Sequence, residues 1–173
     1  MTSFIHPTAI IDDNVEISEG TKIWAYAHIS KGAKIGKNSM IGEGVHIGND
    51  VIIGNDCKIQ NHSLVYRGVT LEDEVFLGPN TITTNDLYPR AKGDWSDRFK
   101  KTLFQKGSSV GANCTVLCGI IMGIHSMAAA GSVVTNDVMD YSLVRGNPAR
   151  HIRFFQGPPF SEQFKHKYMG IRL

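Results

Sequence analysis

A six-residue repeat runs through most of the chain and constrains the fold more than any other feature. The residue four places after each repeat position is small or β-branched throughout, from Ala9 to Thr81. A period of six is not a helical period, and the β-branched bias favours short strands. The repeat positions themselves are all branched aliphatics: Ile5, Ile11, Ile17, Ile23, Ile29, Ile35, Ile41, Ile47, Ile53, Ile59, Val65, Leu71 and Leu77.

This pattern predicts a parallel β-helix. A chain that turns after each hexad winds into a triangular coil of three hexads, or about 18 residues, with the aliphatic residue inside and the small residue at the bend. Successive coils then stack about 4.8 Å apart in parallel register. We expect the corners to need positive φ angles. Glycine after the aliphatic residue and Asn-Asp pairs would supply them, at Gly36, Gly42, Gly48, Gly54, Gly78, Asn49-Asp50 and Asn55-Asp56.

The repeat is interrupted once. Its register breaks after Ile82 and is restored by Val110, with Phe104 as the candidate for the first resumed hexad. The intervening residues, about 83–106, predict a loop that projects from one corner, and loops of this length in compact domains are usually functional. We therefore expect a β-helix domain over residues 1–153 and a C-terminal tail over 154–173, with a short helix from Ser161.

The two parts of the chain differ in charge. Residues 1–82 carry six Lys/Arg and ten Asp/Glu, whereas residues 83–173 carry twelve and six. This asymmetry favours a polyanion on the C-terminal half, either nucleic acid or a phosphorylated cofactor. Three cysteines without a pairing pattern and no secretory signal favour a reducing cytoplasm. No apolar run approaches the roughly 18 to 20 residues that cross a membrane.

Two stretches carry a resemblance to a known family. The run AAAGSVVTNDVMDYSLVRGNPAR (128–150) closely resembles the closing signature of the hexapeptide-repeat acyltransferase superfamily. The run VFLGPNTITTNDLYPRAK (75–92) resembles bacterial enzymes that acetylate the 3-amino group of nucleotide-linked sugars for surface glycans. Their acceptors are a dTDP-3-amino-3,6-dideoxyhexose or, in a related group, a UDP-3-amino-uronic acid, and both alternatives stay open.

The resemblance implies fold, assembly and cofactor. It implies an all-β, left-handed parallel β-helix with one projecting loop and a short C-terminal tail. It also implies a homotrimer with each active site in a groove between neighbours, and acetyl-CoA as the donor, bound along the C-terminal coils. We accordingly expect coenzyme A and a nucleotide-linked amino sugar as partners, without nucleic acid, membrane or metal.

Attack by a sugar amine does not require a general base, because an amine with a pKa near that of an α-amino group, about 7.7 to 8.0, is partly neutral at pH 7. Residues 83–106 contain no histidine, which fits that chemistry. The resemblance makes Asn85, in the family's TND motif, the candidate that orients the amine or stabilises the oxyanion; the alternative is a turn cap with Asp86. His125 is a candidate proton acceptor, and the alternative is an exposed corner histidine.

The binding residues follow from the same resemblance. Asn80, Asn85, Tyr88 and Arg90 are candidates for the nucleotide sugar, although Tyr88 could instead pack the loop onto the prism. For coenzyme A, phosphate contacts are expected from three arginines and pantetheine contacts from two backbone positions. These residues are Arg145, Arg150, Arg153, Gly111 and Ala130.

Two other classes of protein also form such prisms. One is a non-catalytic β-helix, such as a scaffold or an ice-binding prism; an ice-binding prism would carry a flat, exposed threonine-rich column, and the sequence has none. A zinc hydratase would need three histidines. His28 and His46 lie 18 residues apart and should stack, but His62 follows after 16 residues in a different position. The sequence therefore favours the acyltransferase.

Overall fold

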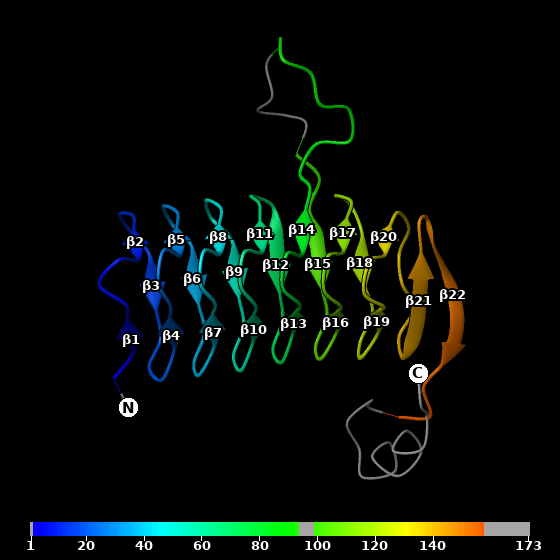
Figure 1. Ribbon diagram of the computed structural model, residues 1–173, viewed down its shortest axis with the longest axis horizontal. Coiled ribbons are helices and arrows are strands. Elements are labelled where there is room, and N and C mark those ends of the chain that lie inside the picture. The colour runs from blue at the N-terminus through cyan, green and yellow to red at the C-terminus, as the bar shows by residue number, and fades with distance from the viewer. Residues whose placement is uncertain (1, 94–98, 158–173) are drawn as a thin grey trace.

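The computed structural model describes residues 2–93 and 99–157, and its coils are stacked along one axis (Figure 1). The strands lie in three sheets, which form the walls of a prism. The chain winds as a left-handed parallel β-helix, which confirms the predicted all-β fold. Short parallel strands form the three walls. No described segment is a helix long and apolar enough to span a membrane.

Each wall is a sheet whose strands come from successive coils. Sheet A consists of β1 (Phe4–Ile5), β4 (Lys22–Ile23), β7 (Met40–Ile41), β10 (Lys58–Ile59), β13 (Phe76–Leu77), β16 (Ser109–Val110), β19 (Met127–Ala128), β21 (Ser142–Gly146) and β22 (Ala149–Phe154). Sheet B consists of β2 (Ile10–Ile11), β5 (His28–Ile29), β8 (His46–Ile47), β11 (Leu64–Val65), β14 (Ile82–Thr83), β17 (Thr115–Val116) and β20 (Val133–Val134). Sheet C consists of β3 (Glu16–Ile17), β6 (Lys34–Ile35), β9 (Ile52–Ile53), β12 (Val69–Leu71), β15 (Thr102–Phe104) and β18 (Ile121–Met122).

The interior follows the repeat. Ile23, Ile41 and Ile59 are fully buried and stack along sheet A, with partners 18 residues apart. The small residue at the bend is often a buried hydroxyl, and its hydrogen bond goes to a backbone carbonyl of a neighbouring wall. Thr21 Oγ1 donates to Gly36 O at 2.6 Å, for example. A small polar residue is tolerated in the core where its hydroxyl is satisfied in this way, as in Thr21, Ser39 and Ser63. The buried hydroxyls of Ser108 and Ser126 have no partner among the described residues.

We expected glycine after the aliphatic residue to supply the positive φ angle of the corner, and this explanation is wrong. Gly36, Gly54 and their equivalents do not have positive φ angles. A Cβ at Gly36 would instead lie 2.5 Å from the carbonyl carbon of Gly54 on the next coil. The positive φ occurs two residues after these glycines, and the prediction for Asp50 (57°) and Asp56 (56°) is confirmed. Glycine is needed here because the coils approach closely, and not because the turn is left-handed.

The predicted loop leaves the prism between β14 and β15 (Figure 1). Across it, paired residues such as Ile82 and Thr115 are 33 rather than 18 positions apart. At the neck of the loop, Lys100 N donates to Asn85 O at 3.2 Å. The prism resumes with β15, where Phe104 is fully buried as predicted.

The C-terminal end differs from the repeat. β22 runs antiparallel to β21 and forms a hairpin on the edge of sheet A, which the hexapeptide pattern did not predict. Phe155 follows β22, is buried, and its backbone nitrogen donates to Tyr141 O at 2.6 Å. The helix expected from Ser161 lies outside the described residues.

Candidate active site

The three corners of the prism carry different candidate residues. We call the turns from sheet A to sheet B the A–B corner, and name the B–C and C–A corners in the same way. Asn80, Gly111 and Ala130 lie at the A–B corner, Asn85 lies in the loop of the B–C corner, and His125 lies at the C–A corner. One prism thus brings the first three together and separates them from Asn85 and His125.

The A–B corner forms a ledge of backbone on the C-terminal coils. A Cβ at Gly111 would lie 2.5 Å from the nitrogen of Ala130, so the two coils are in direct contact. The amide of Gly111 already donates to Ala128 O at 2.9 Å. Among the described residues, however, the amides of Ala112 and Ala130 donate to no acceptor. Two equivalent N–H groups on adjacent coils are therefore available to carbonyl groups of an extended ligand.

Asn80 stands one coil before this ledge. Its backbone has a φ of 57°, and its Nδ2 donates to Asn113 Oδ1 at 3.1 Å. The pair continues the polar surface of the A–B corner, and Asn80 is exposed. An acceptor placed against Asn80 would thus lie beside a donor held by the ledge.

The loop holds Asn85 with its side chain unused. Asp86, and not Asn85, caps the turn, since Asp86 Oδ1 accepts from Tyr88 N at 2.7 Å. The side-chain amide of Asn85 is half-buried and makes no hydrogen bond within the described residues. Arg67, under the loop, lies 5.8 Å from the ring centroid of Phe99. The loop is thus anchored while the Asn85 amide is left available.

Two further candidates lie further out on the loop. Tyr88 is 73% exposed, so it does not pack the loop onto the prism, and that alternative is wrong. Arg90 is exposed and donates from Nη1 to the adjacent Pro89 O at 2.8 Å. Both side chains point to solvent in a single prism and are free to contact a ligand or a neighbouring chain.

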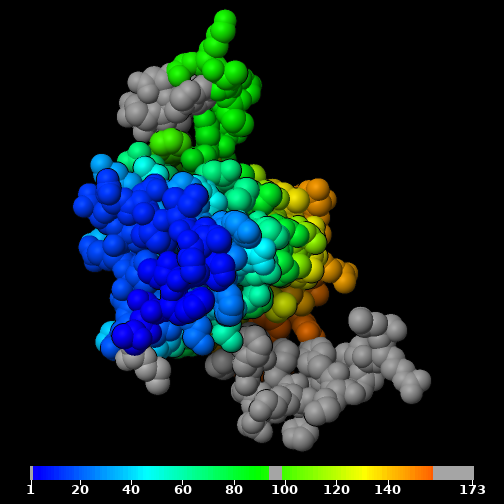
Figure 2. All heavy atoms as spheres, turned by 60° about the vertical axis from the view of Figure 1, so that its left-hand side comes forward, coloured from blue at the N-terminus to red at the C-terminus, as the bar shows by residue number. Residues whose placement is uncertain are grey.

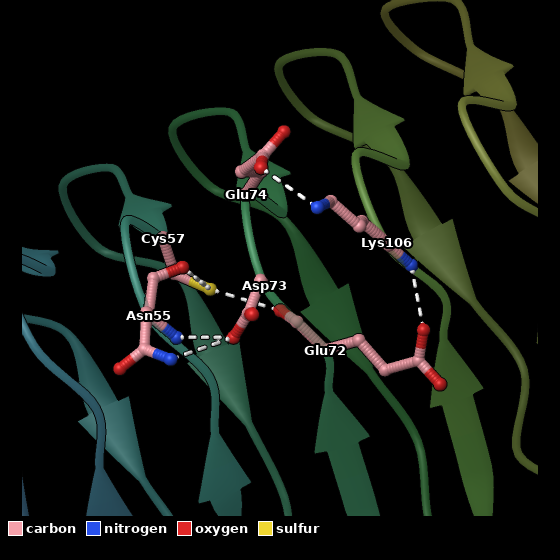
Figure 3. Close-up of polar contacts among 6 residues, drawn as sticks. All are labelled: Asn55, Cys57, Glu72, Asp73, Glu74 and Lys106. Atoms are coloured by element: carbon pink, nitrogen blue, oxygen red, sulfur yellow. Dashed lines mark hydrogen bonds and ion pairs between the residues drawn. The ribbon is translucent and has the colours of Figure 1, made fainter.

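Glu72, Glu74 and Lys106 form a network of polar contacts on the C–A corner (Figure 3), and the backbone of His125 joins it through Lys106. Glu72 Oε2 accepts from Lys106 N at 2.8 Å, and Glu74 Oε1 pairs with Lys106 Nζ at 3.1 Å. Lys106 O then accepts from His125 N at 3.0 Å. The imidazole covers Gly107, where no Cβ would fit, and lies 5.4 Å from the ring of Tyr141. His125 is half-buried and is therefore a packed corner residue in the single prism.

The C-terminal hairpin brings cationic side chains together. Arg145 on β21 lies opposite Arg150 on β22, and both are exposed. Like charges directly opposite each other in a sheet are unfavourable unless an anion lies between them. Arg153 lies opposite Leu143 and stacks with its guanidinium carbon 5.9 Å from the ring centroid of Phe155. The pairing of Arg145 with Arg150 needed the hairpin and could not be read from the repeat.

Comparison with known proteins identifies the family. The family described as bacterial transferase hexapeptide (six repeats) matches residues 14–49 and 32–67. The dTDP-3-amino-3,6-dideoxy-alpha-D-galactopyranose 3-N-acetyltransferase of Aneurinibacillus thermoaerophilus is 46% identical over 149 residues, which cover 86% of this chain and 77% of that protein. The chain belongs to the hexapeptide-repeat acyltransferase family.

Solved structures of other proteins have the same fold as this chain. A hexapeptide-repeat acetyltransferase of Vibrio cholerae in complex with acetyl-coenzyme A is 26% identical, with a TM-score of 0.62 and 73% of each chain covered. The PerB protein of Caulobacter crescentus, in complex with coenzyme A and GDP-perosamine, is 22% identical with a TM-score of 0.52. It covers 88% of this chain, which spans 58% of PerB, and at this identity it supports the fold alone.

Two of the three buried cysteines, Cys57 and Cys114, are poor nucleophiles for an acyltransferase. Burial raises the pKa of Cys57 to about 11 and also raises the pKa of Cys114. A thiol with a raised pKa is protonated near neutral pH and does not attack a thioester. An acyl group would therefore pass directly to the acceptor and not through these residues.

The described histidines outside the C–A corner are not grouped as metal ligands would be. His28 and His46 stack on sheet B with ring centroids 5.4 Å apart, as their spacing predicted. His62 lies on the A–B corner with a φ of 59°. Among residues 2–93 and 99–157, no three His, Cys, Asp or Glu side chains gather around a point where they could hold an ion.

Proposed function

We propose that this protein transfers the acetyl group of acetyl-CoA to the 3-amino group of a dTDP-linked 3-amino-3,6-dideoxyhexose, in the cytoplasm, for bacterial surface glycans such as lipopolysaccharide or S-layer glycan. The observation that carries the proposal is the 46% identity to an enzyme named for that reaction, over 86% of this chain. The structure adds a free amide in the loop and free backbone donors on the A–B corner. These groups suit an amine acceptor and an extended donor.

The reaction needs positioning more than acid–base chemistry. The neutral amine attacks the thioester carbonyl, the oxyanion of the tetrahedral intermediate accepts hydrogen bonds, and the C–S bond breaks as the amine proton leaves with the thiolate. The pantetheine arm of coenzyme A lies along the amides of Ala112 and Ala130, and the phosphates of coenzyme A meet Arg145, Arg150 and Arg153. Asn80, Tyr88 and Arg90 contact the nucleotide sugar, and Asn85 orients the amine or donates to the oxyanion.

A panel of acceptors tests the function. The protein is incubated with acetyl-CoA and with dTDP-3-amino-3,6-dideoxyhexoses of both gluco and galacto configuration, together with a UDP-3-amino-uronic acid, while thiol release is followed. We expect turnover with a dTDP sugar. Turnover with the uronic acid alone would assign the chain to the related group, and no turnover with any 3-amino sugar would refute the proposal.

We propose that the protein assembles as a homotrimer, and the distribution of the candidates over three corners supports an interface between copies. Because Asn85 and His125 lie at different corners of one prism, they can face one ligand only across an interface between two copies. Sedimentation equilibrium at micromolar concentration should give a species of three 19.0 kDa chains. A single species at the mass of one chain would contradict this arrangement.

The facing arginines predict a donor-specific defect. Arg150→Ala should raise the KM for acetyl-CoA by roughly 10- to 100-fold, because one charge-assisted hydrogen bond to phosphate contributes about 1.5 to 3 kcal/mol. The KM for the sugar should stay near that of the wild type. Lys31→Ala, an exposed cation on an N-terminal coil, is the matched control. If Arg150→Ala changes the sugar KM instead, the assignment to coenzyme A is wrong.

A further inference from the structure

A hollow lies on the N-terminal coils, and none of the candidate site residues described above lines it. Its volume is about 360 Å³. Figure 2 looks toward these coils and shows the loop rising beyond them, from the middle of the prism. The lining comes from sheet A and the A–B corner over four successive coils: His6, Trp24, Ala25, Met40, Gly42, Glu43 and Asn61.

One wall of the hollow is aromatic. Trp24 is 42% exposed although it stands at a position held by glycine on the next coil, Gly42. The ring of Phe4 packs against the indole, with ring centroids 5.6 Å apart and the planes tilted by 59°, and His6 also lines the hollow. A supported, half-exposed indole next to the bare backbone of a glycine provides a flat surface and the space to stack a planar ring.

The edge of the hollow opposite Trp24 is polar, and its Asn61 Nδ2 and Glu43 carboxylate make no hydrogen bond or ion pair with described residues. Asn61 Oδ1 accepts from Glu43 N at 3.2 Å, which fixes the amide and leaves Nδ2 without an acceptor among the described residues. The Glu43 carboxylate is exposed and has no cationic partner in that part of the chain. A carboxylate acceptor beside an amide donor matches the N3–H and the adjacent carbonyl of thymine or uracil.

Two lysines flank the floor of the hollow. In the outward column of sheet A, Met40 pairs with Lys22 on one side and with Lys58 on the other. Both lysines are exposed, and neither makes an ion pair with any described residue. Lys58 lies on the same coil as Asn61, between the aromatic wall and Asn80. It is therefore placed to meet phosphates that connect a base at Trp24 to a sugar at Asn80.

We propose that this hollow binds the nucleoside diphosphate of the acceptor, with a thymine or uracil ring on Trp24, its imide edge on Glu43 and Asn61, and the diphosphate on Lys58. This inference rests on the proposed function and specifies where the nucleotide binds. Trp24 lies three coils from Asn80, or about 14 Å at the spacing of stacked strands. An extended nucleoside diphosphate spans that distance, so its sugar reaches the coil next to the Ala112 ledge.

Equilibrium binding of the free nucleotides tests the site without catalysis. By calorimetry on the full chain, dTDP and UDP should bind, and CDP and ADP should bind at least about tenfold more weakly. Glu43→Gln should weaken dTDP about tenfold or more by replacing an acceptor for N3–H with a group that also donates. Trp24→Ala should weaken it to a similar extent while Trp24→Phe retains most of the affinity.

Comparing the affinity for dTDP with the affinity for thymidine shows what the diphosphate contributes to binding. Lys58→Ala should weaken the affinity for dTDP about tenfold or more and leave the affinity for thymidine unchanged. Lys34→Ala on sheet C, where Lys34 is ion-paired with Glu16, should change neither affinity.

Acetyl transfer to the dTDP sugar is measured in parallel. Normal transfer with unchanged KM and dTDP affinity in the Glu43, Trp24 and Lys58 variants overturns the site and leaves the function standing. Tight, variant-sensitive dTDP binding without acetyl transfer overturns the function and leaves the site, and no dTDP binding overturns the site.

Discussion

Asn85→Ala should lower kcat/KM about 100- to 1,000-fold, the range seen when an oxyanion donor or its equivalent is removed. His125→Ala should cost less than the roughly 100-fold expected from loss of a general base. The reason lies in the contacts of the two residues. The Asn85 amide is half-buried and unused, because Asp86 caps the turn. The His125 ring covers Gly107 and packs against Tyr141.

Both variants are measured from pH 6 to 9 after sedimentation has confirmed their assembly. Asn49→Ala is the matched control, since Asn49 is an exposed amide on an earlier coil at the same B–C corner. It should retain wild-type activity. A loss above 1,000-fold for His125→Ala, with Asn85→Ala near wild type, would show that the C–A corner and not the loop carries the chemistry.

Gly36→Ala should destabilise the prism by about 3 kcal/mol or more, a lowering of Tm by about 6 to 12 °C for a chain of this size. Its Cβ would lie 2.5 Å from both the carbonyl carbon and the carbonyl oxygen of Gly54 and 2.8 Å from the nitrogen of Asn55. All three atoms are backbone, so relief requires two coils to move apart. The Gly36 N to Ile53 O hydrogen bond, 2.8 Å long, lies in the same contact.

Thermal unfolding followed by circular dichroism measures this effect. Gly131→Asn is the control, because Gly131 has a φ of +73° but a Cβ there would meet nothing within 4 Å, and asparagine tolerates that φ. We expect it to change Tm by a small fraction of the Gly36→Ala effect. Equal shifts for both variants would mean that the left-handed turn, and not the contact between coils, explains these glycines.

The interior could be predicted from the sequence because one inward slot recurs every six residues, and only burial requires branched aliphatics there. The corner of the prism on which each candidate residue lies is harder to predict from the sequence. Before the loop, the position within an 18-residue coil decides the corner. After the loop, the register depends on how many extra residues the loop inserts, which only the pairing of Ile82 with Thr115 reveals. The free backbone amide of Ala112 could not be predicted from the sequence, since any residue other than proline can supply a backbone N–H.

The reversal of the chain at the C-terminal hairpin has a consequence for solubility. A stack of parallel coils presents an open strand edge at its end, and such an edge can recruit another molecule into an endless fibre. On sheet A the last strand within the described residues, β22, runs antiparallel to its neighbour and carries Arg150 and Arg153. Neighbouring molecules therefore meet a charged strand of the wrong polarity for continuing the coil. The arginines that we propose to bind phosphate would thus also disfavour aggregation at this edge.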